Sequence, residues 1–80
     1  MWFLIRRDKD SLTPTICYCG HYMPSMPRRS IIKSHAFPTQ AIAVETALRL
    51  TKMFEKQGYT YKAEQWKSLK AMKEAGYKIA

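Results

Sequence analysis

The side chains best suited to chemistry in this sequence are Cys17, Cys19 and His21, at alternate positions, followed later by His35. Alternate residues of a regular strand project to one side, so these four side chains form a possible Cys2His2 zinc set if their strands pair. The spacing argues against this, because structural zinc sites take their cysteines from a turn with two to four intervening residues. We therefore expect no metal and no cofactor, and interpret both cysteines as buried thiols of a strand.

A redox or catalytic role also finds little support in the spacing. Cα atoms two residues apart on a strand are separated by about 7 Å, which is the outer limit for a disulfide. The familiar redox pair has two residues between its cysteines. The carboxylates are dispersed, and the sequence contains neither a glycine-rich phosphate loop nor a G-x-S-x-G turn. We expect a protein that is not an enzyme and has no small-molecule substrate.

The stretch that carries the cysteines is predicted to lie in a β-sheet. Trp2–Arg7 is rich in large apolar residues, and Thr13–Cys19 is rich in β-branched and aromatic residues after a polar turn, a pattern typical of a hairpin. The alternation in Ser30–Phe37 predicts a third strand, and the proline- and arginine-containing segment 21–29 is predicted to be a loop. Residues 1–37 should therefore form a three-stranded antiparallel sheet.

The second half of the sequence is predicted to be helical. Thr39 is a good N-cap, and apolar residues then recur every three or four positions, which predicts a helix within residues 38–57 that Gly58 terminates. A second helix is predicted over residues 60–75, as an antiparallel neighbour of the first. Its buried stripe would consist of Tyr61, Gln65, Leu69, Met72 and Ala75. The expected fold is one α+β domain over residues 1–80, with the element order βββαα.

The charge of the chain is strongly positive. Fourteen lysines and arginines stand against six acidic residues, for a formal charge of +8 on 80 residues. Such a field favours polyanionic partners, here nucleic acid or an acidic or nucleic-acid-binding host protein. The candidate binding residues are Arg6, Arg7, Arg28, Arg29, Lys33, Lys62, Trp66, Lys70 and Lys73.

On the wheel of the second predicted helix, Trp66 has Lys62, Lys70 and Lys73 as its angular neighbours. An indole among ammonium groups is typical of surfaces that stack a base beside a phosphate backbone. Alternatively, Trp66 covers the edge of the core while the lysine stems pack against it. The paired arginines of the loop 21–29 also have two interpretations, as a grip on phosphate or carboxylate, or as part of a solvated crossover.

The sequence predicts a cytoplasmic location and no membrane contact. Its first residues, MWFLIRR, place apolar side chains before the arginines, which is the reverse of a secretory signal. No apolar run approaches the roughly 20 residues that span a bilayer. Cysteines outside the secretory route are expected to be reduced.

The join between the third strand and the first helix resembles the arm-binding domain of phage-type integrases, which is related in fold to the AP2 DNA-binding domain. In that family a strand ending in Gly-Phe leads through Thr to a helix with an early Glu-Ala. Phe37, Thr39 and Ala43 match this pattern, whereas Ala36 replaces the glycine and Ile42 replaces the acid.

The layout of residues 1–57 resembles that of the family, whereas the helix predicted after Gly58 has no counterpart in the family's pattern. The resemblance implies a sheet face that enters a major groove, with Arg6, Arg7 and Lys33 as candidate contacts. In size and layout the chain also resembles the small accessory proteins, including anti-CRISPR proteins, with which phages inhibit host machinery. We therefore expect a non-enzymatic module that binds nucleic acid or, alternatively, a phage-encoded inhibitor that binds a host protein or nucleoprotein complex.

Overall fold

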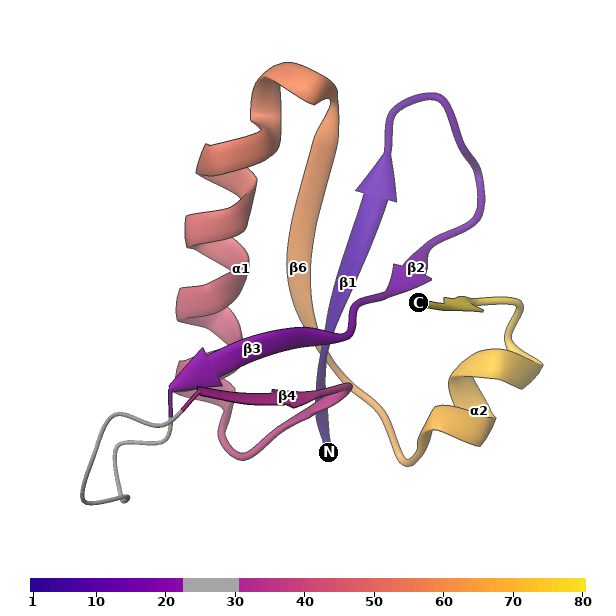
Figure 1. The fold of residues 1–80 in the computed structure, drawn as a ribbon. Coiled ribbons are helices and arrows are strands. Elements are labelled where there is room, and N and C mark those ends of the chain that lie inside the picture. The colour runs from indigo at the N-terminus through magenta and orange to yellow at the C-terminus, as the bar shows by residue number, and fades with distance from the viewer. Residues whose placement is uncertain (23–30) are drawn as a thin grey trace.

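The computed structural model describes residues 1–22 and 31–80, with side chains described for residues 1–18 and 34–80. The fold is of the α+β class (Figure 1). Its elements in chain order are β1 (Trp2–Asp8), β2 (Thr15–Ile16), β3 (Cys19–Tyr22), β4 (Ile31–Ser34), β5 (Ala36–Phe37), α1 (Gln40–Phe54), the 3-10 turn η1 (Glu55–Gln57), β6 (Tyr59–Gln65), α2 (Leu69–Glu74) and β7 (Lys78–Ile79).

Strand β1 is the centre of a five-stranded sheet. Along one edge it pairs antiparallel with β6, from Trp2 opposite Gln65 to Asp8 opposite Tyr59. Along its other edge it pairs antiparallel with β5 near its start and with β2 near its end. Strand β7 continues the sheet beside β2, in parallel orientation. Strands β3 and β4 form a separate, two-stranded antiparallel sheet.

The core lies on both faces of β1, because alternate residues of a strand point to opposite sides. Leu4 packs in one cluster with Ala47 of α1, whereas Phe3 and Ile5 pack in a second cluster with Met72 of α2. The three β1 side chains have no exposed area. Helices α1 and α2 therefore cover opposite faces of the sheet.

Helix α1 begins and ends close to the predicted positions. The Thr39 Oγ1 accepts a hydrogen bond from the Ile42 N–H at 3.2 Å, as an N-cap does. The turn η1 extends the helical stretch to Gln57. Gly58 then adopts the left-handed conformation, with φ 83°, and its N–H donates to the Glu55 carbonyl oxygen at 3.0 Å. This tight turn sends the chain directly into β6, alongside α1.

The predicted second helix over residues 60–75 is wrong, and with it the predicted pair of antiparallel helices. Residues Tyr59–Gln65 form strand β6, and only Leu69–Glu74 is helical, after Ser68 as N-cap. Of the predicted buried stripe, Met72 alone is fully buried. The physical reason is β1, whose whole length offers backbone partners to β6, so that strand pairing outweighs local helix propensity. Neither α1 nor α2 is long and apolar enough to cross a membrane.

The predicted three-stranded sheet is wrong in its third strand. The segment Ser30–Phe37 contains two strands, β4, which pairs with β3, and β5, which pairs with β1. The division falls at His35, where the Ser34 Oγ accepts a hydrogen bond from the Ala36 N–H at 3.1 Å. A serine that bonds the backbone two residues later favours a turn over a continuous ladder.

The predicted hairpin between the first two strands is confirmed in part. Ile5 lies opposite Ile16 in an antiparallel pair of β1 and β2. Strand β2 ends at Ile16, however, and the chain passes into β3, which runs to Tyr22 inside the segment predicted as the loop 21–29. Residues 23–30 lie outside the described part of the chain.

Candidate functional site

The predicted contacts Arg6 and Arg7 lie on opposite faces of the sheet. Residues directly opposite each other on paired strands share a face, and Arg6 lies opposite Tyr61 whereas Arg7 lies opposite Thr60. Tyr61 packs against the cluster that contains α1 residues, so Arg6 is on the α1 side. Arg7 is consequently on the α2 side, and one face of the sheet does not present both arginines.

Arg7 is held in a polar network on the α2 side. Its Nη2 lies 2.7 Å from the Glu64 Oε2 and donates to the Tyr77 hydroxyl at 3.3 Å. The Glu64 Oε1 accepts hydrogen bonds from the Trp66 Nε1 and from the Tyr77 hydroxyl, both at 2.9 Å. The carboxylate thus joins β1, β6 and the segment after α2. Both Arg7 and the indole N–H are engaged within the fold.

Two of these groups have altered acidity. Burial by itself would raise the pKa of Glu64, but hydrogen bonds from Trp66, Arg7 and Tyr77 and the charge of Arg7 outweigh it, and the pKa lies below its ordinary value. The pKa of Tyr77 is raised by burial and by its hydrogen bond to the Glu64 carboxylate. At neutral pH the carboxylate is therefore ionised and the phenol protonated, which is the pairing that the network needs.

Trp66 lies at the edge of the core. It follows β6, and its backbone N–H continues the ladder by donating to the Met1 carbonyl oxygen at 2.9 Å. Its ring is half-buried against the cluster on the α2 side and meets the Tyr77 ring edge-on, with 5.2 Å between centroids. This arrangement matches the interpretation of Trp66 as a cover for the core better than that of an indole standing among lysines on a helix.

The predicted lysines Lys62, Lys70 and Lys73 come from two elements and all are exposed. Lys62 lies opposite Ile5 on β6, so its side chain leaves the sheet on the α2 side, where α2 itself carries the other two. Among the described side chains the one ion pair joins Arg7 to Glu64. The three lysines are therefore positive charges without an acidic partner on the described surface.

The remaining predicted binding residues have side chains that the structure does not describe. Arg28 and Arg29 fall within residues 23–30, which lie outside the described part of the chain. Lys33 belongs to β4, of which the structure describes the backbone. Their roles stay predictions.

The cysteine prediction can be examined at Cys17. This residue is buried, with 9% of its surface exposed, and its thiol donates to the Thr15 carbonyl oxygen at 4.0 Å. In the ranges 1–18 and 34–80 no three His, Cys, Asp or Glu side chains are grouped to hold a metal ion. The side chains of Cys19 and His21 lie outside those ranges, so the absence of zinc stays a prediction.

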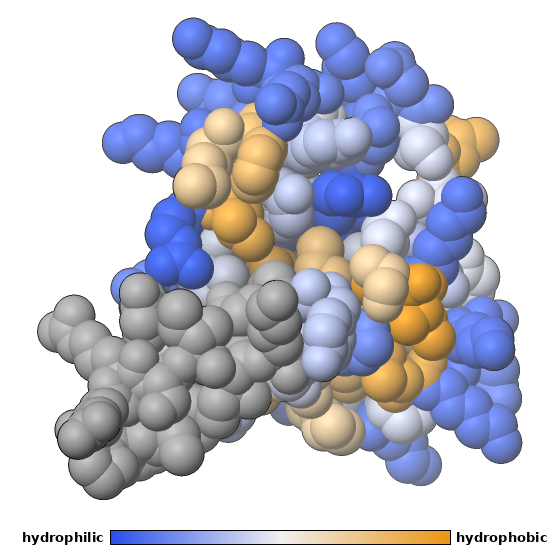
Figure 2. Space-filling view, viewed as in Figure 1, coloured by the Kyte–Doolittle hydropathy of each residue, from blue (hydrophilic) through white to orange (hydrophobic). Residues whose placement is uncertain are grey.

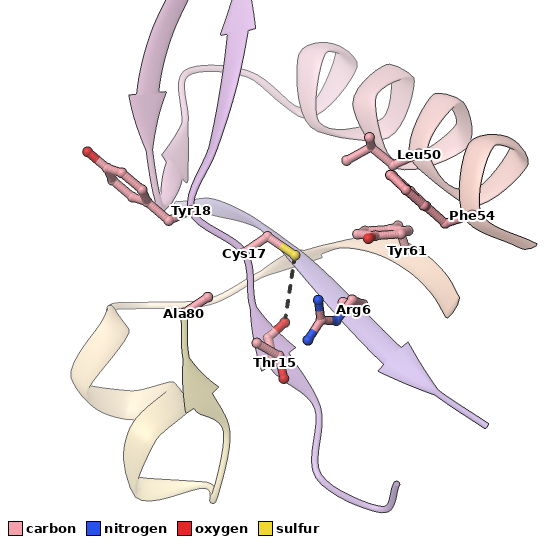
Figure 3. A pocket seen from close by; sticks show the side chains of 8 residues that line it. All are labelled: Arg6, Thr15, Cys17, Tyr18, Leu50, Phe54, Tyr61 and Ala80. Atoms are coloured by element: carbon pink, nitrogen blue, oxygen red, sulfur yellow. Dashed lines mark hydrogen bonds between the residues drawn. The ribbon is translucent and has the colours of Figure 1, made fainter. Parts of the chain in front are cut away.

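A pocket of about 270 Å³ opens on the α1 side of the sheet. Figure 2 shows the face that carries it, hollowed between α1 and β2, with hydrophilic residues gathered over η1 and the loop after β1. The side chains drawn in Figure 3 come from β1, from β2 and the two residues after it, from α1 and β6, and from Ala80 after β7. They surround the hollow, although the Tyr18 ring points away from the others. Those that face one another are Arg6, Thr15, Cys17, Leu50, Phe54 and Tyr61.

The pocket is positioned by a contact between α1 and β6. The Thr51 Oγ1 accepts a hydrogen bond from the Tyr61 N–H at 2.8 Å and donates one to the Tyr61 carbonyl oxygen at 3.0 Å. The Tyr61 ring lies 6.1 Å from the Phe54 ring, between centroids. On the same face of the sheet, the Arg6 Cζ lies 4.8 Å from the centre of the Tyr59 ring.

The sequence does not predict this pocket. Arg6 is a predicted contact because of its charge, but Tyr61 is predicted to lie on the buried stripe of a helix that does not form. The usable signal was the run Tyr59-Thr60-Tyr61, whose aromatic and β-branched residues favour a strand. Comparison of the chain with protein-family models, curated proteins and solved structures finds no match. The function is therefore argued from charge and geometry.

Proposed function

We propose that this chain is a non-enzymatic binding module that engages nucleic acid through the α2 side of the sheet. The observation that carries the proposal is the set of exposed lysines Lys62, Lys70 and Lys73, which have no acidic partner on the described surface. On a chain with a formal charge of +8, such side chains release counterions when they meet phosphates. Arg28, Arg29 and Lys33 are proposed as further contacts.

The proposed surface differs from the one implied by the resemblance to integrase arm-binding domains. That resemblance requires one sheet face to present both Arg6 and Arg7, and the two leave β1 on opposite sides. Arg7 is also paired with Glu64, at 2.7 Å. The lysines, in contrast, are free to contact a phosphate backbone without breaking an internal ion pair.

The test of this function is the salt dependence of binding. Phosphate contacts position a protein on nucleic acid without reading the sequence, so affinity should vary little between unrelated sequences and fall steeply with salt. Fluorescence anisotropy with labelled duplex DNA, single-stranded DNA and RNA at several salt concentrations measures both. An affinity that is unmeasurable at low salt, or that is insensitive to salt, would contradict the proposal.

A second candidate function is inhibition of a host protein by a phage-encoded chain that acts in the host cytoplasm. The observation in its favour is an exposed apolar pair on the outer side of α1, Val44 at 39% and Leu48 at 69% exposure, one helical turn apart. A pull-down from host lysate with and without nuclease separates the two candidates. Partners lost on nuclease treatment indicate nucleic acid, and partners retained indicate a protein.

A further inference from the structure

The Arg6 guanidinium at the pocket forms no ion pair with a described carboxylate, although the last residue, Ala80, also lines the pocket. Arg6 is half-buried and stands against the Tyr59 ring at 4.8 Å, but it takes part in no ion pair among the described side chains. Its neighbour Arg7, in contrast, is paired with Glu64. A guanidinium carries five N–H donors in a planar fork that matches carboxylate and phosphate oxygens. The Tyr59 ring lies against the guanidinium, and the guanidinium lies close to the Tyr61 hydroxyl at the pocket.

The Tyr61 hydroxyl adds a second donor. Burial is the main cause that raises the pKa of Tyr61, and the nearby Cys17 raises this pKa further. Together these two causes outweigh Arg6, which lowers the pKa. The phenol therefore stays protonated at neutral pH and can donate a hydrogen bond to an anion. The two hydrogen bonds between the Thr51 hydroxyl and the Tyr61 backbone hold the residue in place.

The opposite wall of the pocket is apolar. Leu50 and Phe54 project from consecutive turns of α1 toward the sheet, and the Phe54 and Tyr61 rings are inclined by 45° to one another. An aliphatic and an aromatic side chain at this spacing offer contact area to a planar ring. The polar and apolar groups thus lie at two sides of one hollow.

The volume limits the ligand. A pocket of about 270 Å³ is slightly below the roughly 300–1,000 Å³ typical of sites for drug-sized molecules. A ligand up to the size of a pyrimidine mononucleotide is accommodated, whereas a dinucleotide exceeds the space.

We propose that this pocket binds a ring-bearing organic anion no larger than a mononucleotide, with the anionic group at Arg6 and Tyr61 and the ring against Leu50 and Phe54. The proposal does not depend on the nucleic-acid function, because the pocket and the lysines Lys62, Lys70 and Lys73 lie on opposite sides of the sheet. It involves binding and no reaction.

The test is a titration of the full chain followed by two-dimensional amide NMR. Four probes separate the requirement for an anionic group from the requirement for a ring. They are thymidine 5′-monophosphate and phenylacetate, which have both, thymidine, which lacks the anionic group, and inorganic phosphate, which lacks the ring. We expect at least one of the two ring-bearing anions to shift the amides of Arg6, Cys17, Leu50, Phe54 and Tyr61. Thymidine and phosphate should bind at least about tenfold more weakly, because each lacks one half of the contacts. Whichever of the two ring-bearing anions has the higher affinity identifies phosphate or carboxylate as the preferred anionic group.

Variants of Arg6, with Arg49→Gln as the control, test the assigned contact. Arg6→Gln should weaken binding of the preferred probe about tenfold or more, since it removes charge-assisted hydrogen bonds, and Arg49→Gln removes the same charge from an exposed position of α1 and should leave binding unchanged. If Arg6→Gln does not fold, Arg6→Lys keeps the charge without the fork and should weaken binding severalfold. The proposal is overturned if no probe shifts the pocket amides, or if a folded Arg6 variant binds like the wild type. Replacement of Lys62, Lys70 and Lys73 by glutamine should leave ligand binding at the pocket unchanged. The pocket and the proposed nucleic-acid surface can therefore fail or succeed independently.

Discussion

The Thr51 hydroxyl satisfies both outward-facing backbone groups of Tyr61, as an acceptor at 2.8 Å and as a donor at 3.0 Å. Strand β6 is the edge of the sheet next to α1, and an edge strand presents unpaired N–H and C=O groups. A single side chain of α1 therefore takes the place of a neighbouring strand at this point. The same contact sets the distance between Phe54 and Tyr61 at the pocket.

Thr51→Val should destabilise the fold, because the isosteric side chain leaves the Tyr61 N–H and C=O without a partner. The expected loss in the free energy of unfolding is about 1–3 kcal/mol. Thr51→Ser keeps the hydroxyl and serves as the matched control, with a smaller loss from the deleted methyl group. Urea denaturation followed by circular dichroism measures both. Equal stabilities of the two variants would show that the hydrogen bonds contribute little.

Glu64→Gln should destabilise the fold in a pH-dependent way. The pKa of Glu64 is lower in the folded chain than its ordinary value of 4.5, so its contribution is complete above that value and is lost as pH falls through the folded pKa. The variant should therefore be less stable than the wild type by about 1–2 kcal/mol at pH 7, and the difference should shrink toward pH 3. Urea denaturation across this range measures the difference.

The matched control is Glu45→Gln, which neutralises an exposed carboxylate of α1. It should change the free energy of unfolding by less than about 0.5 kcal/mol at every pH. A Glu64→Gln difference that stays constant from pH 7 to pH 3 would contradict an ionised Glu64 as the centre of the network.

Trp66→Phe should separate the two interpretations of the indole. The variant keeps an aromatic ring at the edge of the core but loses the hydrogen bond to Glu64, at an expected cost of about 1–3 kcal/mol in the free energy of unfolding. Because the ring is packed against Tyr77, we expect the affinity for single-stranded DNA to remain unchanged. If stability is kept and affinity falls, the indole stacks a base instead.

The folded chain is expected to contain no stoichiometric zinc. The cysteine spacing disfavours it, Cys17 lies in the core beneath α1, and the Nε2 of His35 is 2.9 Å from the Ala80 carbonyl oxygen. Elemental analysis of a tag-free preparation should find far less than one zinc per chain, and a chelator should not unfold it. One zinc per chain with unfolding on chelation would make Cys17, Cys19, His21 and His35 the candidate ligands.

The sequence predicted elements where local signals decide the structure. Thr39 and Gly58 mark the limits of the first helix because an N-cap and a left-handed residue act on neighbouring backbone groups. The buried position of Cys17 followed from the apolar character of its stretch.

The sequence does not predict elements whose structure depends on pairing between strands far apart along the chain. Residues Tyr59–Gln65 become a strand because β1, more than fifty positions earlier, lies beside them in full register. Over seven residues, the apolar periodicity of a helix and that of a strand are too similar to show which of the two forms. The ion pair of Arg7 with Glu64 and the pocket at Arg6 both depend on that register, so neither could be derived from local patterns.

The replacement of Lys62, Lys70 and Lys73 by glutamine tests the proposed nucleic-acid surface most directly. Each neutralised phosphate adds roughly 0.9 to the negative slope of log K against log salt for a duplex, so the variant should lose up to about 2.7 from that slope if all three lysines contact phosphates. The matched control replaces Lys9, Lys52 and Lys56, which are also exposed and carry the same charge. Because long-range attraction depends on total charge, both variants should bind somewhat more weakly at low salt. A loss of slope restricted to the first variant identifies the α2 side as the contact surface, whereas equal slopes for the two variants would exclude it and favour the protein-inhibitor function.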